Sequence, residues 1–275
     1  MKEINIEEDH VNLLWTGGWD STFQLLQLLL IYKSNVVPYY LIHEDRHSTG
    51  MELKTIIKIK NYLLEKFPHT KDLLRPVQYF AVNDLVHDDK IANAYKSIQK
   101  EKHIGWQYEW LAFLCKEIEI YDMQLSVEKS LFPLENHWDL DIEKMLIADN
   151  ENSQIQYIID SKHRETNEYQ LFKYFSFPII KITKKEMSKI SADKGWNEIM
   201  QMTWFCHNPT NDKKPCGKCK PCLTVIQEGF GKRISTKRRF VSFIYRKFIW
   251  PMKSIIKQMH SPITSAKKRI IAVNH

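Results

Sequence analysis

The stretch LLWTGGWDST, residues 13–22, joins two different kinds of sequence. An apolar run over residues 11–15 precedes the turn and is typical of a buried β-strand. Residues 21–33 follow it with apolar side chains at most positions, as in a helix packed on a sheet. Two adjacent glycines, hydroxyl residues and one aspartate stand between them. The sequence therefore predicts a strand, a tight polar turn and a helix in succession.

A glycine-rich turn between a strand and a helix is an arrangement that binds phosphate. Gly17 and Gly18 let backbone amides converge without obstruction by side chains. Thr16, Ser21 and Thr22 supply hydroxyl groups, and the new helix supplies free N–H groups and the positive end of its dipole. We therefore expect an anion to bind in this turn.

The spacing of the turn matches neither the dinucleotide-binding fingerprint nor the Walker loop, because no third glycine stands at the right offset and no lysine follows. A pyrophosphate group would be held by amides, hydroxyls and a magnesium ion, for which Asp20 is the nearest carboxylate. The alternative is a tight connection without a ligand, in which Asp20 or Ser21 only caps the helix.

Strands and helices alternate beyond the turn, which predicts a doubly wound α/β fold with a parallel sheet, because each crossover helix returns the chain across the sheet. Further strands are expected at residues 36–43, 76–82, 124–128 and 177–182, and helices at 51–67 and 104–118. Thr183 and Glu186 form a capping box that predicts another helix. Acidic and amide residues interrupt the pattern over residues 129–170, where we expect an insertion or a mobile active-site segment.

Four of the five cysteines lie close together in the sequence, with the spacing C-x9-C-x2-C-x2-C. They are Cys206, Cys216, Cys219 and Cys222. Four thiolates can surround one tetrahedral zinc ion at about 2.3 Å and leave no position for water, so we expect a structural zinc site. Redox-active cysteines and an iron–sulfur cluster are the alternatives. Cys115 falls on the apolar face of its helix and is expected in the core.

The positive charge of the chain is concentrated at its end. The net charge is +7, yet residues 231–275 hold 12 Lys and Arg and no Asp or Glu, so the first 230 residues carry 28 basic and 33 acidic residues. We expect residues 1–230, with the zinc loop at 206–222, to form one domain that contains the anion-binding turn, and residues 231–275 to form a basic amphipathic tail. An acidic partner, a nucleic acid or a membrane surface could bind this tail, and a solvated extension is the alternative.

The first ten residues are acidic and lack the apolar core of a signal sequence, and residues 25–31 are too few to span a bilayer. Cysteines grouped for a metal indicate a reducing compartment. We therefore expect a cytoplasmic protein.

Two groups of motifs resemble known proteins. TGGWDST, residues 16–22, resembles the SGGxDS signature of the PP-loop ATP pyrophosphatases, with Thr16 in place of serine. PIIKITKKEM (178–187), MTWFCHNP (202–209) and PCGKCKPC (215–222) are similar to the C-terminal third of the 7-cyano-7-deazaguanine synthase family. HEDRHSTGMELK (43–54) resembles a segment of that family in which Arg46, His47 and Glu52 are the matching positions. The chain departs from the family at residues 105–108, where the family has Gly-Arg-Asn.

The resemblance implies that residues 1–230 form a PP-loop ATP-binding domain that uses ATP, Mg²⁺ and a structural Zn²⁺. It implies a ligase that adenylates a carboxylate, 7-carboxy-7-deazaguanine or a related heterocyclic acid, releases pyrophosphate, and forms an amide or nitrile with ammonia or another amine. Asp20, Ser21, Arg46 and His47 are then the catalytic candidates. The ATP-binding candidates are Thr16, Gly17, Gly18, Trp19, Asp20, Ser21 and Thr22.

Other functions stay open at this stage. A PP-loop enzyme that modifies tRNA by thiolation would use ATP to activate a base and a cysteine to carry sulfur, and the basic tail would bind the RNA. A non-catalytic nucleotide-binding module could instead recruit a partner through the tail. A homodimer is one expected assembly. Trp19, Trp106 and Tyr108 are candidates to stack on a flat heterocycle, although aromatic residues at such positions also occur in cores.

Overall fold

The stretch 13–22 begins with the last two residues of strand β1, His10–Leu14, and continues into the turn after it. β1 lies inside a sheet whose strand order is β3-β2-β1-β4-β7-β6-β5. The computed structural model describes residues 10–130, 138–149 and 154–249, and within these residues seven strands form this one sheet. The chain divides into two compact units, Met1–Trp204 and Phe205–His275. The first unit contains the sheet, and the second contains the four grouped cysteines.

The sheet is parallel over most of its width. The other strands are β2 Asn35–Ile42, β3 Gln78–Ala81, β4 Met123–Gln124, β5 Leu146–Asp149, β6 Gln156–Ile159 and β7 Phe175–Ser176. The pairs β1–β2, β2–β3, β1–β4 and β4–β7 are parallel, whereas β5–β6 and β6–β7 are antiparallel. The predicted α/β fold is confirmed, and the expectation of parallel pairing fails for the two pairs that β6 forms, with β5 and with β7.

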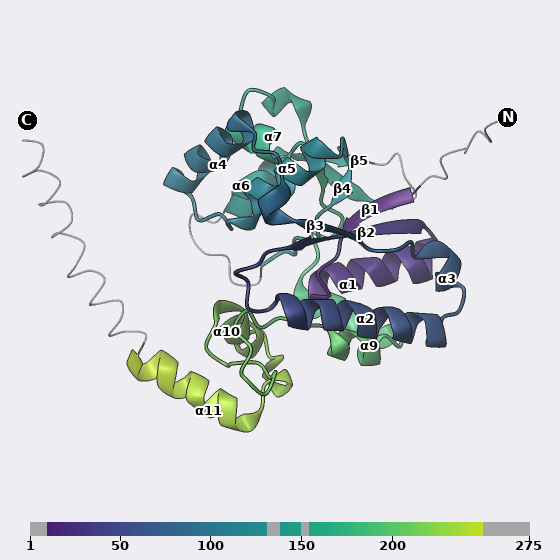
Figure 1. The fold of residues 1–275 in the computed structure, drawn as a ribbon, viewed down its shortest axis with the longest axis vertical. Helices are drawn as coiled ribbons and strands as arrows, with labels where there is room; N and C mark the ends of the chain where they lie inside the picture. Colours follow the sequence, from purple (N-terminus) through teal and green to yellow (C-terminus); the bar gives the residue numbers. More distant parts are fainter. Residues whose placement is uncertain (1–9, 131–137, 150–153, 250–275) are drawn as a thin grey trace, which may run out of the picture. The chain divides into compact units, whose positions relative to one another are not determined.

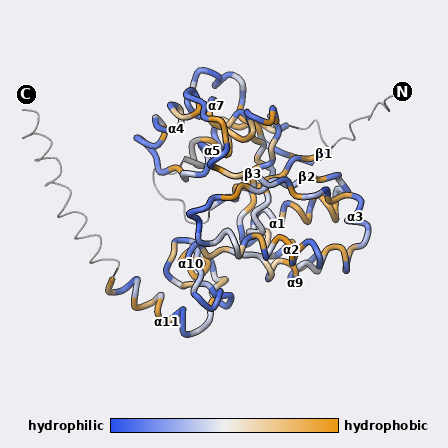
Figure 2. The backbone as a smooth tube through the Cα atoms, viewed as in Figure 1, coloured by the Kyte–Doolittle hydropathy of each residue, from blue (hydrophilic) through white to orange (hydrophobic). Residues whose placement is uncertain are grey.

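Helices cover both faces of the sheet, as a doubly wound fold requires. Figure 1 shows α4, α5 and α7 on one side and α1, α2 and α9 on the other. The helices of this unit are α1 Trp19–Leu26, continued by a π-helix Gln27–Tyr32, α2 Thr49–Lys66, α3 Thr70–Leu73, α4 Asp89–Glu101, α5 Gln107–Glu117, α6 Trp138–Met145, α7 Asn167–Phe172, α8 Lys184–Asp193 and α9 Asn197–Met202. Hydrophobic and hydrophilic residues alternate along α2 in Figure 2, as expected of a helix with one buried face.

The strand predicted at residues 177–182 is wrong. The strand is Phe175–Ser176, and the chain then turns, with the amide of Ile182 donating to the carbonyl of Ile179 at 2.9 Å. Phe177, Ile179 and Ile180 in this segment are buried, which is why it resembles a strand in the sequence. Pro178 has no N–H group to donate to a ladder, which weakens pairing at that position, although β2 continues through Pro38. β4 is likewise shorter than predicted and ends at Gln124.

The described parts of residues 129–170 form α6, β5, β6 and α7, and β5 and β6 extend the sheet beyond β7. Buried amide side chains join this extension to the rest of the sheet. Gln124 Nε2 donates to Gln154 Oε1 at 3.2 Å and to Gln156 Oε1 at 3.3 Å, and its Oε1 accepts from Gln24 of α1 at 2.8 Å. These buried polar residues conceal the strand pattern in the sequence.

The second unit contains α10 Lys220–Gln227, a 3₁₀ turn Gly231–Arg233, α11 Thr236–Ile244 and a π-helix Tyr245–Ile249. The packing boundary at Trp204 precedes the cysteines. The functional division after residue 230 stays a prediction. Over the residues that the structure describes, no helix combines the length and the apolar character needed to cross a membrane.

Candidate functional site

Trp15 joins the end of β1 to the first turn of α1. Its amide donates to the carbonyl of Tyr39 at 2.9 Å and so continues the pairing with β2. Its indole Nε1 donates to Thr22 Oγ1 at 3.1 Å, and both side chains are fully buried. Thr22, predicted to bind ATP, therefore turns its hydroxyl toward the core, where it fixes the helix against the strand.

The two glycines shape the turn. Gly17 has φ +70° and its carbonyl accepts from the amide of Trp204 at 2.9 Å. A Cβ atom at Gly17 would lie 3.1 Å from Thr55 Cγ2 of α2, so the backbone passes close to that helix. Gly18 is the N-cap of α1 and has no side chain to cap the first turn. The positive end of this helix is thus left for an outside acceptor.

Two hydroxyl groups face each other across the turn. Thr16 Oγ1 and Ser21 Oγ lie 3.4 Å apart, and the amide of Gly18 donates to Thr16 Oγ1 at 3.3 Å. Thr16 is exposed and Ser21 is buried. The exposed edge of the turn therefore carries a hydroxyl group beside the start of a helix, which is suited to an anion.

A lysine that the sequence reasoning missed lies beside the turn. Lys184 Nζ is 2.5 Å from Glu128 Oε1 and 3.9 Å from Asp20 Oδ1. Asp20 belongs to the first turn of α1, and Glu128 follows β4. Asp20 Oδ1 is buried and accepts no hydrogen bond in this structure. The turn that lacks its own lysine thus has a cation from a residue far along the chain.

The predicted capping box fixes the position of Lys184. The amide of Glu186 donates to Thr183 Oγ1 at 3.2 Å, and the amide of Thr183 donates to Glu186 Oε2 at 2.8 Å. Both bonds of the box are present, so this prediction is confirmed. Lys184 is the first residue of the helix that the box begins. The sequence signal was present, but it pointed only to a helix start.

Arg46 lies in a buried network next to α2. Its guanidinium is 3.1 Å from Glu52 Oε1 and its Nε donates to Ser48 Oγ at 3.1 Å. Tyr40 OH donates to Glu52 Oε2 at 3.0 Å, and both side chains are buried. Burial and the charge of Glu52 raise the pKa of Tyr40 far above its ordinary value. Arg46 therefore neutralises a buried carboxylate, while His47 is exposed in the same loop.

The three aromatic candidates differ in exposure. Trp19 and Tyr108 are 7% and 8% exposed, whereas Trp106 is 49% exposed. Trp106 contacts the ring of His43 edge-on, with ring centroids 4.7 Å apart, and His43 follows the end of β2. His43 Nδ1 is buried without a hydrogen bond in this structure. Trp106 is the one of the three whose ring a ligand could cover without displacing the core.

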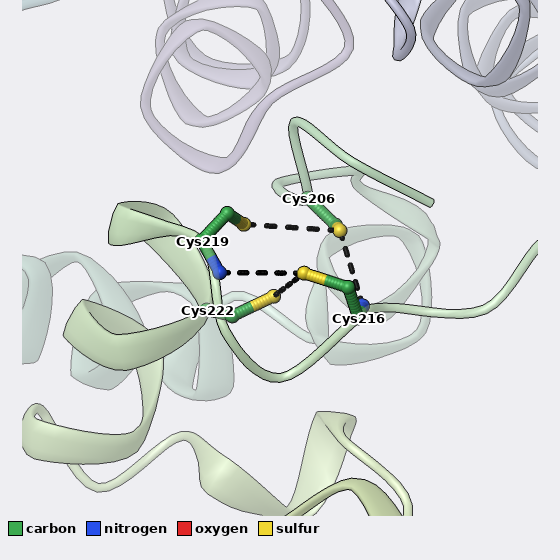
Figure 3. Close-up of side chains that lie close together, drawn as sticks. All are labelled: Cys206, Cys216, Cys219 and Cys222. Atoms are coloured by element: carbon green, nitrogen blue, oxygen red, sulfur yellow. Dashed lines mark hydrogen bonds between the residues drawn. The ribbon is translucent and has the colours of Figure 1, made fainter. Parts of the chain in front are cut away.

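The four grouped cysteines form one cluster in the second unit. Their sulfur atoms all lie within 4.8 Å of one another. Cys206 and Cys219 Sγ are 3.8 Å apart, and Cys216 and Cys222 Sγ are 3.9 Å apart. Figure 3 shows the four side chains converging from two segments. Bonds of about 2.3 Å around one tetrahedral ion place sulfur ligands about 3.8 Å apart, so the cluster fits a single ion.

Backbone amides point at these sulfur atoms. The amide of Cys216 donates to Cys206 Sγ at 3.2 Å, and the amides of Lys218 and Cys219 donate to Cys216 Sγ at 3.3 Å each. Such bonds stabilise thiolates and orient them as ligands. Gly217 has φ +76°, and a Cβ atom there would lie 2.6 Å from the carbonyl oxygen of Arg238. Glycine is therefore required at this position of the loop.

The pKa values of the grouped thiols are shifted in opposite directions. Hydrogen bonds with Cys206 and Cys222 lower the pKa of Cys219, whereas hydrogen bonds with Cys206 and Cys219 raise the pKa of Cys222. One thiolate in the cluster opposes ionisation of the next, so a cation is needed for all four to ionise. Cys115 lies apart from this cluster, in the core of the first unit, and burial raises its pKa far above the ordinary value.

The sheet is mostly parallel and defines an α/β fold, in which the uncapped glycine turn after β1 and the neighbouring lysine form a candidate anion site at the carboxyl edge of the strands. Residues 150–233 match the family described as "Queuosine biosynthesis protein QueC". The family resemblance stated from the sequence is thus confirmed over this segment, which is less than a third of the 275 residues.

One solved structure similar to this chain is the U34-tRNA thiolase NcsA from Methanococcus maripaludis with its [4Fe-4S] cluster. The sequence identity is 12%, the match covers 87% of this chain and 72% of that chain, and the TM-score is 0.38. No curated protein sequence matches this chain.

Proposed function

We propose that this chain is an ATP-dependent ligase that adenylates a carboxylate, releases pyrophosphate and transfers the acyl group to ammonia or another amine. One observation carries the proposal. An uncapped glycine turn, a lysine and two carboxylates meet at the end of β1, from three separate parts of the chain. The match of residues 150–233 to the QueC family supports this choice among the reactions that use ATP.

The chain's own groups have distinct parts in the reaction. The amides at Gly17 and Gly18 and the Ser21 hydroxyl hold the β- and γ-phosphates of ATP. Lys184 compensates the charge that grows on the departing pyrophosphate. Asp20 and Glu128 are oxygen donors of the type that Mg²⁺ prefers, and both lie within 3.9 Å of one ammonium group. A bound Mg²⁺ would neutralise phosphate oxygens.

The acid substrate is 7-carboxy-7-deazaguanine or a related flat heterocyclic acid, as the family resemblance suggests. The half-exposed ring of Trp106 is suited to stack on such a ring system. The segment around Trp106 is where the sequence departs from the family, so a related acid remains within the proposal.

The four-cysteine cluster holds a structural zinc ion in this proposal. A cubane iron–sulfur cluster needs four thiolates on four different iron atoms, which must stand further apart than ligands of one ion. Sulfur distances of 3.8 and 3.9 Å support zinc.

The test is to incubate the protein with ATP, Mg²⁺, ammonium and 7-carboxy-7-deazaguanine, and to measure AMP and the product mass. We expect one AMP for each amide formed, and a second AMP for each nitrile, because removing water from the amide requires another activation by ATP. Lys184→Met should lower kcat/KM at least about 100-fold, because a charge that stabilises the transition state is lost. Lys185→Met is the matched control, since that side chain is exposed on the same turn, and it should keep full activity.

Two other functions make different predictions. A thiolation enzyme that uses Cys115 as its sulfur carrier would lose activity in Cys115→Ser and would need RNA. The complete burial of Cys115 disfavours it. A non-catalytic nucleotide-binding module would bind ATP without forming AMP with any acid. Activity of Cys115→Ser without RNA contradicts the first, and AMP formation contradicts the second.

A further inference from the structure

Helix α11 and the π-helix that follows it present an apolar face to the surroundings. Phe240, Phe243, Ile244 and Phe248 are 63%, 49%, 37% and 55% exposed. Their spacing of three, four and eight residues from Phe240 places them along one side of a helix. Figure 2 shows hydrophobic and hydrophilic residues alternating along α11.

The opposite side of α11 packs inside its own unit. Ser242 is fully buried, and the carbonyl of Arg238 lies against Gly217 of the cysteine loop. Both residues, Arg238 and Ser242, lie on the side of the helix opposite Phe240. The helix is therefore fixed by its polar side, and its apolar side is the exposed one, which is the reverse of an ordinary surface helix.

The charge around this face has one sign. Lys237 and Arg239 flank it at one end, and Lys247 lies at the other. Lys247 Nζ is 5.6 Å from the ring centroid of Phe243 and 5.8 Å from that of Phe248, so its stem runs beside both rings. No acidic residue occurs from Gly231 to the end of the chain. A surface that binds this face of α11 must therefore offer both apolar groups and negative charge.

We propose that this apolar basic face of α11 binds the surface of an anionic lipid bilayer, with the helix lying in the plane of the interface. Phenylalanine and isoleucine side chains enter the boundary between headgroups and acyl chains, while the lysines contact lipid phosphates. Phosphate groups of a nucleic acid would attract the lysines as well. An aliphatic side chain such as Ile244 gains nothing in a groove lined by phosphates, and it gains from contact with acyl chains.

The test uses the full-length protein and flotation with vesicles. One set of vesicles is phosphatidylcholine alone, and the other is phosphatidylcholine mixed with phosphatidylglycerol. We expect the protein to float with the mixed vesicles, to stay below with the neutral ones, and to be released by high salt. The double variant Phe240→Ser and Phe243→Ser should weaken binding at least about tenfold, because two rings no longer leave water.

The matched control is Ile57→Ser with Val86→Ser, which removes two exposed apolar side chains from the first unit and should bind as the unchanged protein does. Lys237→Gln with Lys247→Gln should also weaken binding to the mixed vesicles. All these side chains are at the surface, so the substitutions should not unfold the protein. Thermal unfolding of each variant should show a transition close to that of the unchanged protein.

Several results would overturn the proposal. Equal flotation with neutral vesicles would remove the role of charge, and unchanged flotation of the phenylalanine variant would remove the role of the apolar face. Tighter binding to a single-stranded oligonucleotide than to the mixed vesicles, lost in the lysine variant but kept in the phenylalanine variant, would make the tail a nucleic-acid site instead.

Discussion

At the scale of single residues, the candidate site depends on a few positions where the backbone conformation allows only one residue type. Gly17 is one of them, because its φ of +70° and the nearby Thr55 side chain both exclude a larger residue. Lys184 is different, because its role depends on where the fold places its ammonium group, beside Asp20 and Glu128. Lys185 beside it has the same chemistry and is exposed.

We predict that Gly17→Ala destabilises the protein by about 1 to 3 kcal/mol and abolishes ATP binding. The alanine would be strained in the left-handed region, and its methyl group would push the turn away from Thr55 of α2. Urea unfolding and titration with ATP measure the two effects. Gly50→Ala is the control, because a Cβ atom at Gly50, inside α2, meets nothing within 4 Å. Equal effects of the two changes would contradict the argument.

At the scale of elements, polar residues hold helices and strands in place. Asp88 is the N-cap of α4, where its Oδ1 accepts from the amide of Ile91 at 2.9 Å. It also forms an ion pair with Lys116 of α5. These donors lower the pKa of Asp88, so its stabilising effect is complete above the pKa of an unfolded aspartate and is lost as the pH falls through the lower folded value.

We predict that Asp88→Ala lowers the free energy of unfolding by about 1 kcal/mol at neutral pH. The difference from the unchanged protein should shrink below about pH 4, because protonated Asp88 no longer attracts Lys116. Urea unfolding at a series of pH values measures it. Asp89→Ala is the control, since that side chain is exposed. A difference that stays constant down to low pH would contradict the ionic explanation.

The buried glutamines make a second element-scale prediction. Gln124→Leu should lower the free energy of unfolding by about 2 to 3 kcal/mol, because Gln24, Gln154 and Gln156 would lose their shared partner inside the protein. Relative to the unchanged protein, the variant should show faster hydrogen exchange at β6 and unchanged exchange at β2, because of these two strands only β6 depends on the bonds of Gln124. Uniform loss of protection across the sheet would contradict this local role.

The same elements show how far a sequence predicts this fold. The glycine turn, the first three strands and the capping box were predicted because each has a local signal of periodicity or turn chemistry. The strand predicted at 177–182 was wrong because buried apolar residues in a turn have the same sequence pattern as a short buried strand, and the turn bond from Ile182 to Ile179 has no sequence signal. Glu128 and Lys184 were missed because only the fold brings them to Asp20.

At the scale of the whole molecule, the chain consists of two units that depend on different forces. The first, Met1–Trp204, has a large core on both faces of its sheet. The second has short helices and a cluster of four cysteines. A small unit of this kind has too little buried apolar surface to be stable alone and commonly depends on a metal.

We predict that Cys216→Ser with Cys219→Ser removes the zinc and unfolds the second unit while the sheet stays folded. Four thiolates close a tetrahedral site, and two cannot hold the ion against competing water. Metal analysis should find one equivalent of zinc per chain in the unchanged protein and none in the variant. Hydrogen exchange should show lost protection from residue 205 to 249 and unchanged protection in β1 and β2. Cys115→Ser is the control that keeps the zinc. Iron with visible charge-transfer absorption in place of zinc, or full protection of α10 in the double variant, would contradict a structural zinc site.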